Sequence, residues 1–336
     1  MPGQLEAPQR YNDDWRGWPV RPHDGPHPIR GSFLDPRADV RLGAVYHDGL
    51  DIAVRDDRPE RGAPPDRTHR VYAVEGGRVA AATRPGVRGL VDIGHFRYEH
   101  VDALVRQGEL VEAGQPIGWT CFDTWHVHLG ERLVTPGGKT RWINPLRPGG
   151  KIAPFVDTAK PAIHEIRYYT PADSHWVLRT GNVARLPQAG RRLDKQRLSG
   201  IVDVRVNADD PQSFVGWFRD LPWLAAPHHP FRLALTIVDL GSGLIVDQRD
   251  VFRSEQYLPL PAVRHYAPGT EQNLPANGCM RQHRRVRCRG SYWFRLFEQR
   301  YWNTTRLPNG RYRLRVRAWD VAGNTAKTDS NVTIRN

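Results

Sequence analysis

The chain has 336 residues, enough for about two domains that each bury a core. Hydrophobic residues make up 39% and charged residues 25%, which excludes a disordered chain, and no run of 18 apolar residues predicts a transmembrane helix. The net charge of +13 lies almost wholly after residue 155, where 28 Lys and Arg stand against 16 Asp and Glu, so the second half suits an anionic partner.

The first half is predicted to hold an extended lead-in and a β domain. Residues 1–40 are rich in Pro, Arg and Asp and form the lead-in. Over residues 41–155, short apolar runs such as Val71–Val74 alternate with Gly and Pro, which predicts strands and turns. Gly and Pro cluster at 145–161, so we place the domain boundary at 155–160.

Residues 160–336 are predicted to form a second, antiparallel β domain. Apolar and polar residues alternate over 202–207 and 231–237. The clearest case is 311–318, where Tyr, Leu, Val and Ala line one face of the predicted strand and four Arg line the other. Asn309-Gly310 before it is a hairpin-turn signal. Together with the 31 Gly and 28 Pro, these patterns predict an all-β, mostly antiparallel protein whose second domain is a β-sandwich.

Histidine and carboxylate residues gather in three short motifs of the first half. These are His47-Asp48-Gly49-Leu50-Asp51, Tyr98-Glu99-His100 and His126-Val127-His128. Two neutral imidazoles and one carboxylate suit zinc and leave a fourth position for water. His126 and His128, two positions apart on a strand, share a face. Each motif alone is weak, because a single His is usually a surface or core residue; His228-His229 is expected to lie in a loop.

The order and spacing of the motifs resemble the lysostaphin-type family of zinc endopeptidases, which includes the β-lytic metallopeptidases. The sequence around the motifs also resembles the family. Its entry strand is similar to Pro28-Ile29-Arg30-Gly31-Ser32-Phe33, and its Val-x-x-Gly-Gln-x-Ile-Gly stretch is similar to Val111-Glu112-Ala113-Gly114-Gln115-Pro116-Ile117-Gly118. The resemblance covers about residues 17–150. It implies one zinc ion bound by His47, Asp51 and His128, with His100 and His126 as the two catalytic histidines.

Some residues depart from the family pattern. Phe122 and Trp125 stand before His126, where the family usually has small residues, and they put the substrate preference in doubt. Cys121 is a small buried residue or, alternatively, a thiolate ligand. Tyr98 is expected to pack rather than to donate to a transition state.

The resemblance implies a secreted or cell-wall-associated bacterial endopeptidase that cuts cross-links or stem peptides of peptidoglycan through a zinc-activated water. The alternative is a non-catalytic wall-binding or regulatory protein on the same peptidase fold. The start of the chain shows no apolar signal-peptide region. No nucleic-acid-binding motif is present, so a nucleic-acid partner is not expected.

The C-terminal half weakly resembles bacterial immunoglobulin-like modules, with long insertions. Its basic charge, including the loop 281–289, suits an anionic wall polymer or is a solvated surface. Cys279 and Cys288 permit one disulfide without demanding it. All five motif residues precede the domain boundary. We therefore expect the peptidase activity to reside in the first half and the binding of an anionic surface in the basic second half.

Overall fold

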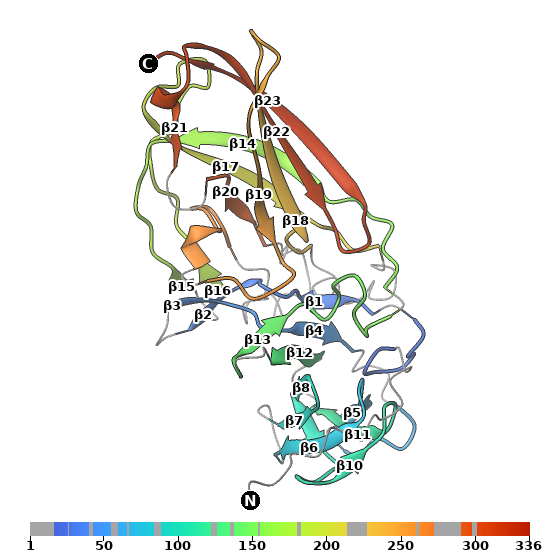
Figure 1. Cartoon of the computed structure of the whole chain (residues 1–336). Coiled ribbons are helices and arrows are strands. Elements are labelled where there is room, and N and C mark those ends of the chain that lie inside the picture. The colour runs from blue at the N-terminus through green and yellow to red at the C-terminus, as the bar shows by residue number, and fades with distance from the viewer. Residues whose placement is uncertain are drawn as a thin grey trace, which may run out of the picture. The chain divides into compact units, whose positions relative to one another are not determined.

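The computed structural model describes residues 17–25, 27–39, 43–54, 60–65, 67–83, 89–121, 126–134, 138–153, 155–179, 183–213, 227–259, 262–271, 290–297 and 301–336. Over these ranges the chain forms β-strands and short 3-10 helices but no α-helix (Figure 1). The paired strands whose register is described run antiparallel, which confirms the all-β prediction. In this part of the chain no helix has the length and apolarity needed to cross a bilayer.

The contacts within the chain divide it into two compact units. Unit 1 holds the described residues up to His27 together with Asp51–Phe155, and unit 2 holds Pro28–Leu50 together with Val156–Asn336. The segment 28–50 therefore belongs with the C-terminal half, although the sequence analysis assigned it to the lead-in and the first domain. The limits 1–40, 41–155 and 160–336 stay predictions.

Unit 1 is built from two sheets. In the larger one β4, β12, β8, β7, β6 and β10 follow one another, with β13 beside β12; the smaller has the order β5-β11-β9. The strands are β4 (Leu50–Ala53), β5 (Arg67–Tyr72), β6 (Gly77–Ala82), β7 (Leu90–Ile93), β8 (Phe96–Glu99), β9 (Val101–Ala103), β10 (Leu110–Val111), β11 (Pro116–Cys121), β12 (His126–Val134) and β13 (Thr140–Ile143).

The period of two in β12 decides which side chains its two faces carry. Val127 and Leu129 are fully buried on one face, and His126 and His128 share the other. β12 pairs with β8 so that His128 lies opposite Glu99. The sheet thus holds two imidazoles side by side on a rigid strand.

The described residues of unit 2 form two larger sheets, two short ribbons and two 3-10 helices. One sheet has the order β14-β17-β20 with β21 on β17, the other β19-β18-β22-β23; β15 pairs with β16, and β2 with β3. The elements are β1 (Ile29–Gly31), β2 (Pro36–Asp39), β3 (Gly43–Tyr46), β14 (Ala162–Tyr169), β15 (Val177–Arg179), β16 (Val183–Arg185), β17 (Ile201–Asp209), β18 (Arg232–Asp239), β19 (Ile245–Arg253), η3 (Ala262–Arg264), β20 (Trp293–Arg295), β21 (Trp302–Asn303), η4 (Thr304–Arg306), β22 (Gly310–Trp319) and β23 (Thr325–Ile334).

The alternation predicted for 311–318 is confirmed in β22. Tyr312, Leu314, Val316 and Ala318 are at most 1% exposed, whereas the four Arg between them reach solvent. The Asn309-Gly310 hairpin is not formed, because β22 pairs with β18 and with the following β23 and not with the preceding strand. The Asn309 side chain instead bonds the backbone of Asn336.

A buried ion cluster ties β17 to β20. The carboxylate of Asp203 accepts hydrogen bonds from Arg205 Nε at 2.8 Å and from Arg295 Nη1 at 2.6 Å, and all three residues are buried. Burial lowers the pKa of the Arg205 guanidinium, and the neighbouring carboxylate opposes that effect.

Candidate metal centre

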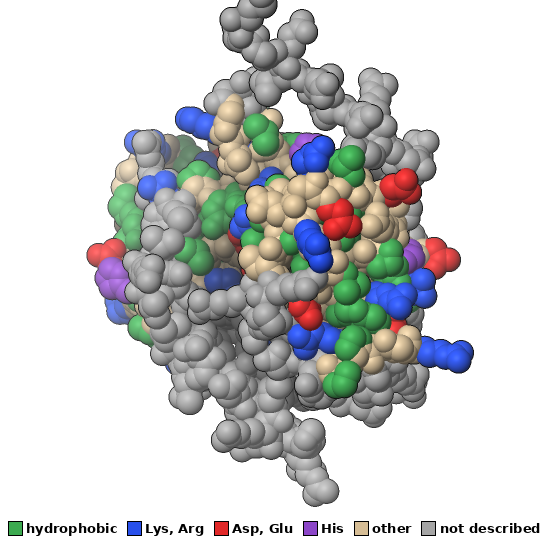
Figure 2. All heavy atoms as spheres, turned by 90° about the horizontal axis from the view of Figure 1, so that it is seen from below, with side chains coloured by type: hydrophobic (Ala, Val, Ile, Leu, Met, Phe, Trp, Pro, Cys, Tyr) green, Lys and Arg blue, Asp and Glu red, His purple; other side chains and the backbone are tan. Residues whose placement is uncertain are grey.

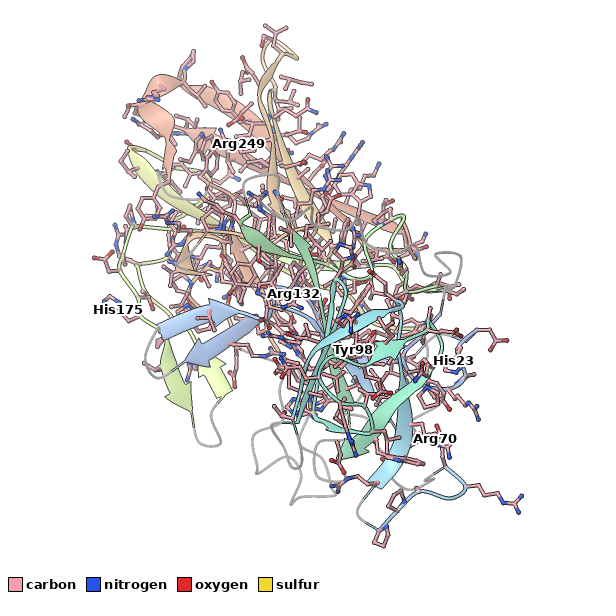
Figure 3. The ribbon with its side chains drawn as sticks, turned by 60° about the horizontal axis from the view of Figure 1, so that its bottom comes forward. His23, Arg70, Tyr98, Arg132, His175 and Arg249 are labelled. Carbon is pink, nitrogen blue, oxygen red and sulfur yellow. The ribbon has the colours of Figure 1, made fainter. Side chains whose placement is uncertain are left out.

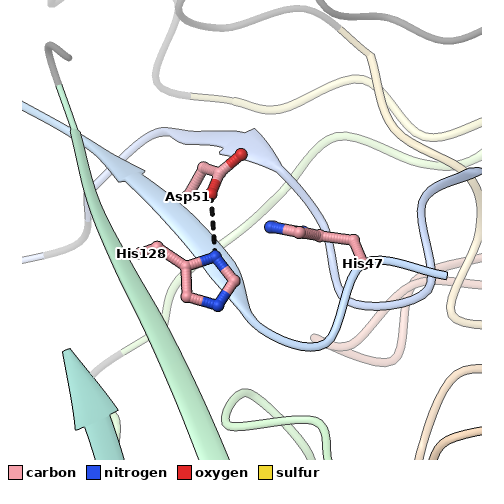
Figure 4. Close-up of side chains that lie close together, drawn as sticks. All are labelled: His47, Asp51 and His128. Carbon is pink, nitrogen blue, oxygen red and sulfur yellow. Dashed lines mark hydrogen bonds and ion pairs between the residues drawn. The ribbon is translucent and has the colours of Figure 1, made fainter. Parts of the chain in front are cut away.

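The three side chains that the family resemblance implies as metal ligands come together. His47, Asp51 and His128 are each at most 7% exposed, and each offers a ligand atom within 4.8 Å of the others. Figure 4 shows the His47 ring pointing toward the Asp51 carboxylate, which the His128 ring approaches from β12. It is the one such group among the residues described. A buried group of two imidazoles and one carboxylate can hold a metal ion.

His47 stands directly after β3, at the open end of the β2–β3 ribbon. Its N–H donates to the Asp35 carbonyl and its own carbonyl accepts from the Leu34 N–H, both at 2.8 Å. Its Nδ1 lies 2.9 Å from the Ser32 carbonyl oxygen. Because a carbonyl can only accept, Nδ1 carries the proton, and Nε2 of the neutral ring keeps its lone pair for a ligand.

The turn that orients His47 is held by the C-terminal part of unit 2. His229 Nε2 donates to the Phe33 carbonyl at 2.9 Å, and the Tyr266 hydroxyl donates to the Leu34 carbonyl at 2.8 Å. Three consecutive carbonyls, those of Ser32, Phe33 and Leu34, thus accept from His47, His229 and Tyr266. Residues far along the sequence position the turn that the His47 ring leans on.

A second set of contacts fixes the same segment on either side of that turn. His228 Nε2 donates to the Ile29 carbonyl at 2.6 Å, and burial lowers the pKa of His228 to about 4. The Tyr257 hydroxyl donates to the Tyr46 carbonyl at 3.1 Å, one residue before His47. Segment 28–50 is therefore bound by polar contacts within unit 2 at Ile29, Phe33, Leu34 and Tyr46.

Asp51 and His128 occupy β4 and β12, which neighbour each other in the larger sheet of unit 1. His128 Nδ1 lies 3.2 Å from Asp51 Oδ1, the dashed contact in Figure 4. His126 Nε2 lies 3.5 Å from the same oxygen. The Asp51 carboxylate therefore lies near both His126 and His128. Because the two histidines share one face of the strand, the sequence alone did not show which of them is the metal ligand and which is catalytic.

His100 joins this cluster through His126. The centroids of the two rings are 4.6 Å apart in an edge-to-face arrangement. His100 has a φ of 65°, a left-handed conformation that costs energy for any residue with a Cβ. The strained backbone places its ring next to the buried imidazoles, so both histidines proposed as catalytic lie beside the ligand group.

Tyr98 has a structural role. It is fully buried in β8, and its hydroxyl accepts the Val74 N–H at 2.7 Å; it is among the side chains labelled in Figure 3. Burial raises the pKa of the phenol far above its usual range. A buried hydroxyl that fixes a backbone N–H matches the packing role expected for it.

The donor chemistry of the group fits zinc. Zinc accepts imidazole nitrogen and carboxylate oxygen, and three protein ligands leave one position open for water or substrate. The hydrogen bond from His47 Nδ1 to a carbonyl is the outer contact that metal-binding histidines usually make. The atoms present are compatible with other divalent ions as well, so the identity of the metal belongs to the proposal below.

Several expectations concern residues outside this picture. Phe122, Trp125, Cys279, Cys288 and the basic loop 281–289 lie outside the described residues, as does the side chain of Cys121. The sequence analysis did not identify the residues of unit 2 that hold segment 28–50, namely His228, His229, Tyr257 and Tyr266. The one available signal was the adjacent pair His228-His229, which does lie in a loop and reaches segment 28–50 from there.

Comparison of the chain with protein-family models, with curated proteins and with solved structures finds no match. The resemblance to lysostaphin-type peptidases therefore rests on the motifs themselves.

Proposed function

We propose that this chain is a zinc-dependent endopeptidase that hydrolyses peptide bonds in bacterial cell-wall peptidoglycan. The observation that supports the proposal best is the buried group His47, Asp51 and His128 with two further histidines beside it. A surface or core role would not require two ligand-type side chains of one motif to meet a third that stands 77 residues beyond Asp51 in the chain.

In this proposal His47, Asp51 and His128 hold one zinc ion. When bound, zinc lowers the pKa of a coordinated water toward neutrality and polarises the scissile carbonyl. Either His126, whose Nε2 lies 3.5 Å from Asp51 Oδ1, or His100 beside it accepts the proton of the attacking water and passes it to the leaving amine. A positioned imidazole of this pair also donates a hydrogen bond to the carbonyl oxygen as its negative charge grows.

The substrate and location follow from the motif resemblance. The substrate class is the cross-links or stem peptides of peptidoglycan, and the protein acts outside the cytoplasm or at the cell wall. The alternative is a wall-binding or regulatory protein that keeps the site without turnover. No contact among the described residues favours this alternative over the peptidase, and the experiment below distinguishes the two.

The test combines metal content with product analysis. The purified chain is expected to carry one zinc per molecule and to release peptidoglycan fragments whose masses identify the bond cut. His128→Ala should lose zinc and activity together, whereas His126→Ala and His100→Ala should keep zinc while turnover falls by about a hundredfold or more. Stoichiometric zinc without any fragment released from several peptidoglycan types would favour the non-catalytic alternative, and zinc loss in all three variants would mean that the roles are wrongly divided.

A further inference from the structure

One outer sheet face of unit 2 carries a row of evenly spaced cations. Strand β22 is labelled in Figure 1. Its buried side chains alternate with four arginines on the opposite face, Arg311, Arg313, Arg315 and Arg317. Alternate residues of a strand are about 6.7 Å apart, so the row is regular. The register pairs Arg317 with Lys327 of β23 on the same face. We name these five residues together with Arg232 of β18 the arginine face.

Carboxylates offset only part of this charge. Asp329 of β23 accepts two hydrogen bonds from Arg315 at 2.8 Å and lies 3.8 Å from Arg313. Asp250 of β19 pairs with Arg232 at 2.6 Å. Six basic residues thus stand against two acidic partners. By contrast, the face seen in Figure 2 intersperses basic, acidic and hydrophobic side chains.

The chemistry of the row points to repeated phosphate groups. A guanidinium offers a planar fork of donors that matches phosphate oxygens, and Arg is the usual residue at such contacts. β22 lies between β18 and β23, so its backbone is paired on both sides and its arginines leave the strand at regular intervals. A regular row suits a linear polymer with one anionic group per repeat.

The same face lacks the features that recognise nucleic-acid bases. Single-stranded nucleic acid is bound by charge together with aromatic rings on which the bases stack. On β22 the arginine row is followed, two residues after Arg317 and on the same face, by one aromatic side chain, Trp319. The Arg232 guanidinium lies 4.6 Å from the centre of the Trp319 ring. The ring is therefore already stacked on a cation of the protein.

We propose that the arginine face binds a linear, base-free phosphodiester polymer of the bacterial cell wall. It holds the protein on the wall through charge, while the candidate metal centre uses none of its residues. The proposal goes beyond the proposed peptidase activity, and a binding measurement tests it whether or not the chain cuts peptidoglycan.

The test uses the full-length protein and a poly(glycerol phosphate) chain as the probe, with neutral dextran and single-stranded DNA as comparisons. The triple variant R311Q/R313Q/R317Q leaves the Arg315–Asp329 pair intact. The matched control R191Q/R192Q/R197Q removes the same charge from exposed positions elsewhere in unit 2. Thermal unfolding checks that both variants keep their fold.

The arginine-face triple should lose about tenfold or more in affinity, and the dependence of log affinity on log salt should become shallower by about 2. The control triple should bind within about twofold of the parent. D329N, which removes a carboxylate from the face, should bind more tightly at low salt. Equal weakening in both triples, unchanged affinity in the arginine-face triple, or tighter binding of DNA than of poly(glycerol phosphate) would each overturn the proposal.

Discussion

Removing the Tyr266 hydroxyl should weaken binding at the proposed zinc site, to which Tyr266 contributes no ligand. The hydroxyl donates to the Leu34 carbonyl at 2.8 Å, and both residues are fully buried. Tyr266→Phe keeps the ring, and with it the packing on Tyr46, whose ring centre lies 6.3 Å away. The variant therefore removes one hydrogen bond and leaves a buried carbonyl without that donor.

The size of the effect follows from that unsatisfied carbonyl. Leaving a buried acceptor without its donor costs about 1–3 kcal/mol. Two residues before Leu34 in the same turn, the Ser32 carbonyl accepts the proton of His47 Nδ1, so a turn that shifts to recover solvation also turns the His47 ring. If the cost falls on the zinc-competent arrangement, the affinity for zinc drops between about fivefold and about 150-fold, which spans the losses of about 10- to 100-fold typical of outer contacts at metal sites.

The assay is competition for zinc with a chromophoric chelator, alongside urea unfolding of the metal-free protein. Tyr168→Phe is the matched control, because the Tyr168 hydroxyl also makes a buried hydrogen bond in unit 2, to Ser330 Oγ at 2.9 Å. Both variants should be less stable, but only Tyr266→Phe should bind zinc more weakly. The reasoning fails if Tyr266→Phe keeps zinc affinity within about twofold while losing stability, or if Tyr168→Phe loses as much zinc affinity.

Two further predictions concern buried charge. The pKa of His228 is about 4 in the folded chain, because burial disfavours the charged ring, and about 6.5 in the unfolded chain. Between these two values the unfolded state binds more protons than the folded state. The free energy of unfolding therefore falls as the pH is lowered through this range. From pH 7 to pH 5 this residue should remove about 2 kcal/mol, and urea titrations of His228→Gln should show a fall smaller by that amount; an unchanged pH dependence would contradict the burial argument. Asp203→Asn should cost about 3–5 kcal/mol in the free energy of unfolding because the charges of Arg205 and Arg295 stay buried, whereas Asp329→Asn at the exposed pair should cost about 1 kcal/mol or less. Equal losses in these two variants would show that burial does not set the cost.

Patterns local in the sequence predicted much of the fold. The period of two in 311–318 is a property of any strand with one buried face, so the alternation alone identified the inward and outward residues of β22. The Asn309-Gly310 signal failed because turn chemistry says that the chain can reverse there, and not which strands then pair. Strand pairing depends on contacts between residues far apart in sequence, which no short window contains.

The candidate metal centre divides in the same way. Residue types and spacing singled out the three motifs, and the resemblance to the lysostaphin-type family implied His47, Asp51 and His128 among them; the structure brings these three together. Only the tertiary structure decided how His47 is held: its segment belongs to unit 2, where His229 and Tyr266 bind the turn beneath its ring. The sequence order alone placed His47 with the first half, whereas the residues that hold its segment come from the second. Hydrogen bonds to backbone carbonyls leave no residue-type signature at the acceptor, so Phe33 and Leu34 gave no sign in the sequence of the partners they would meet.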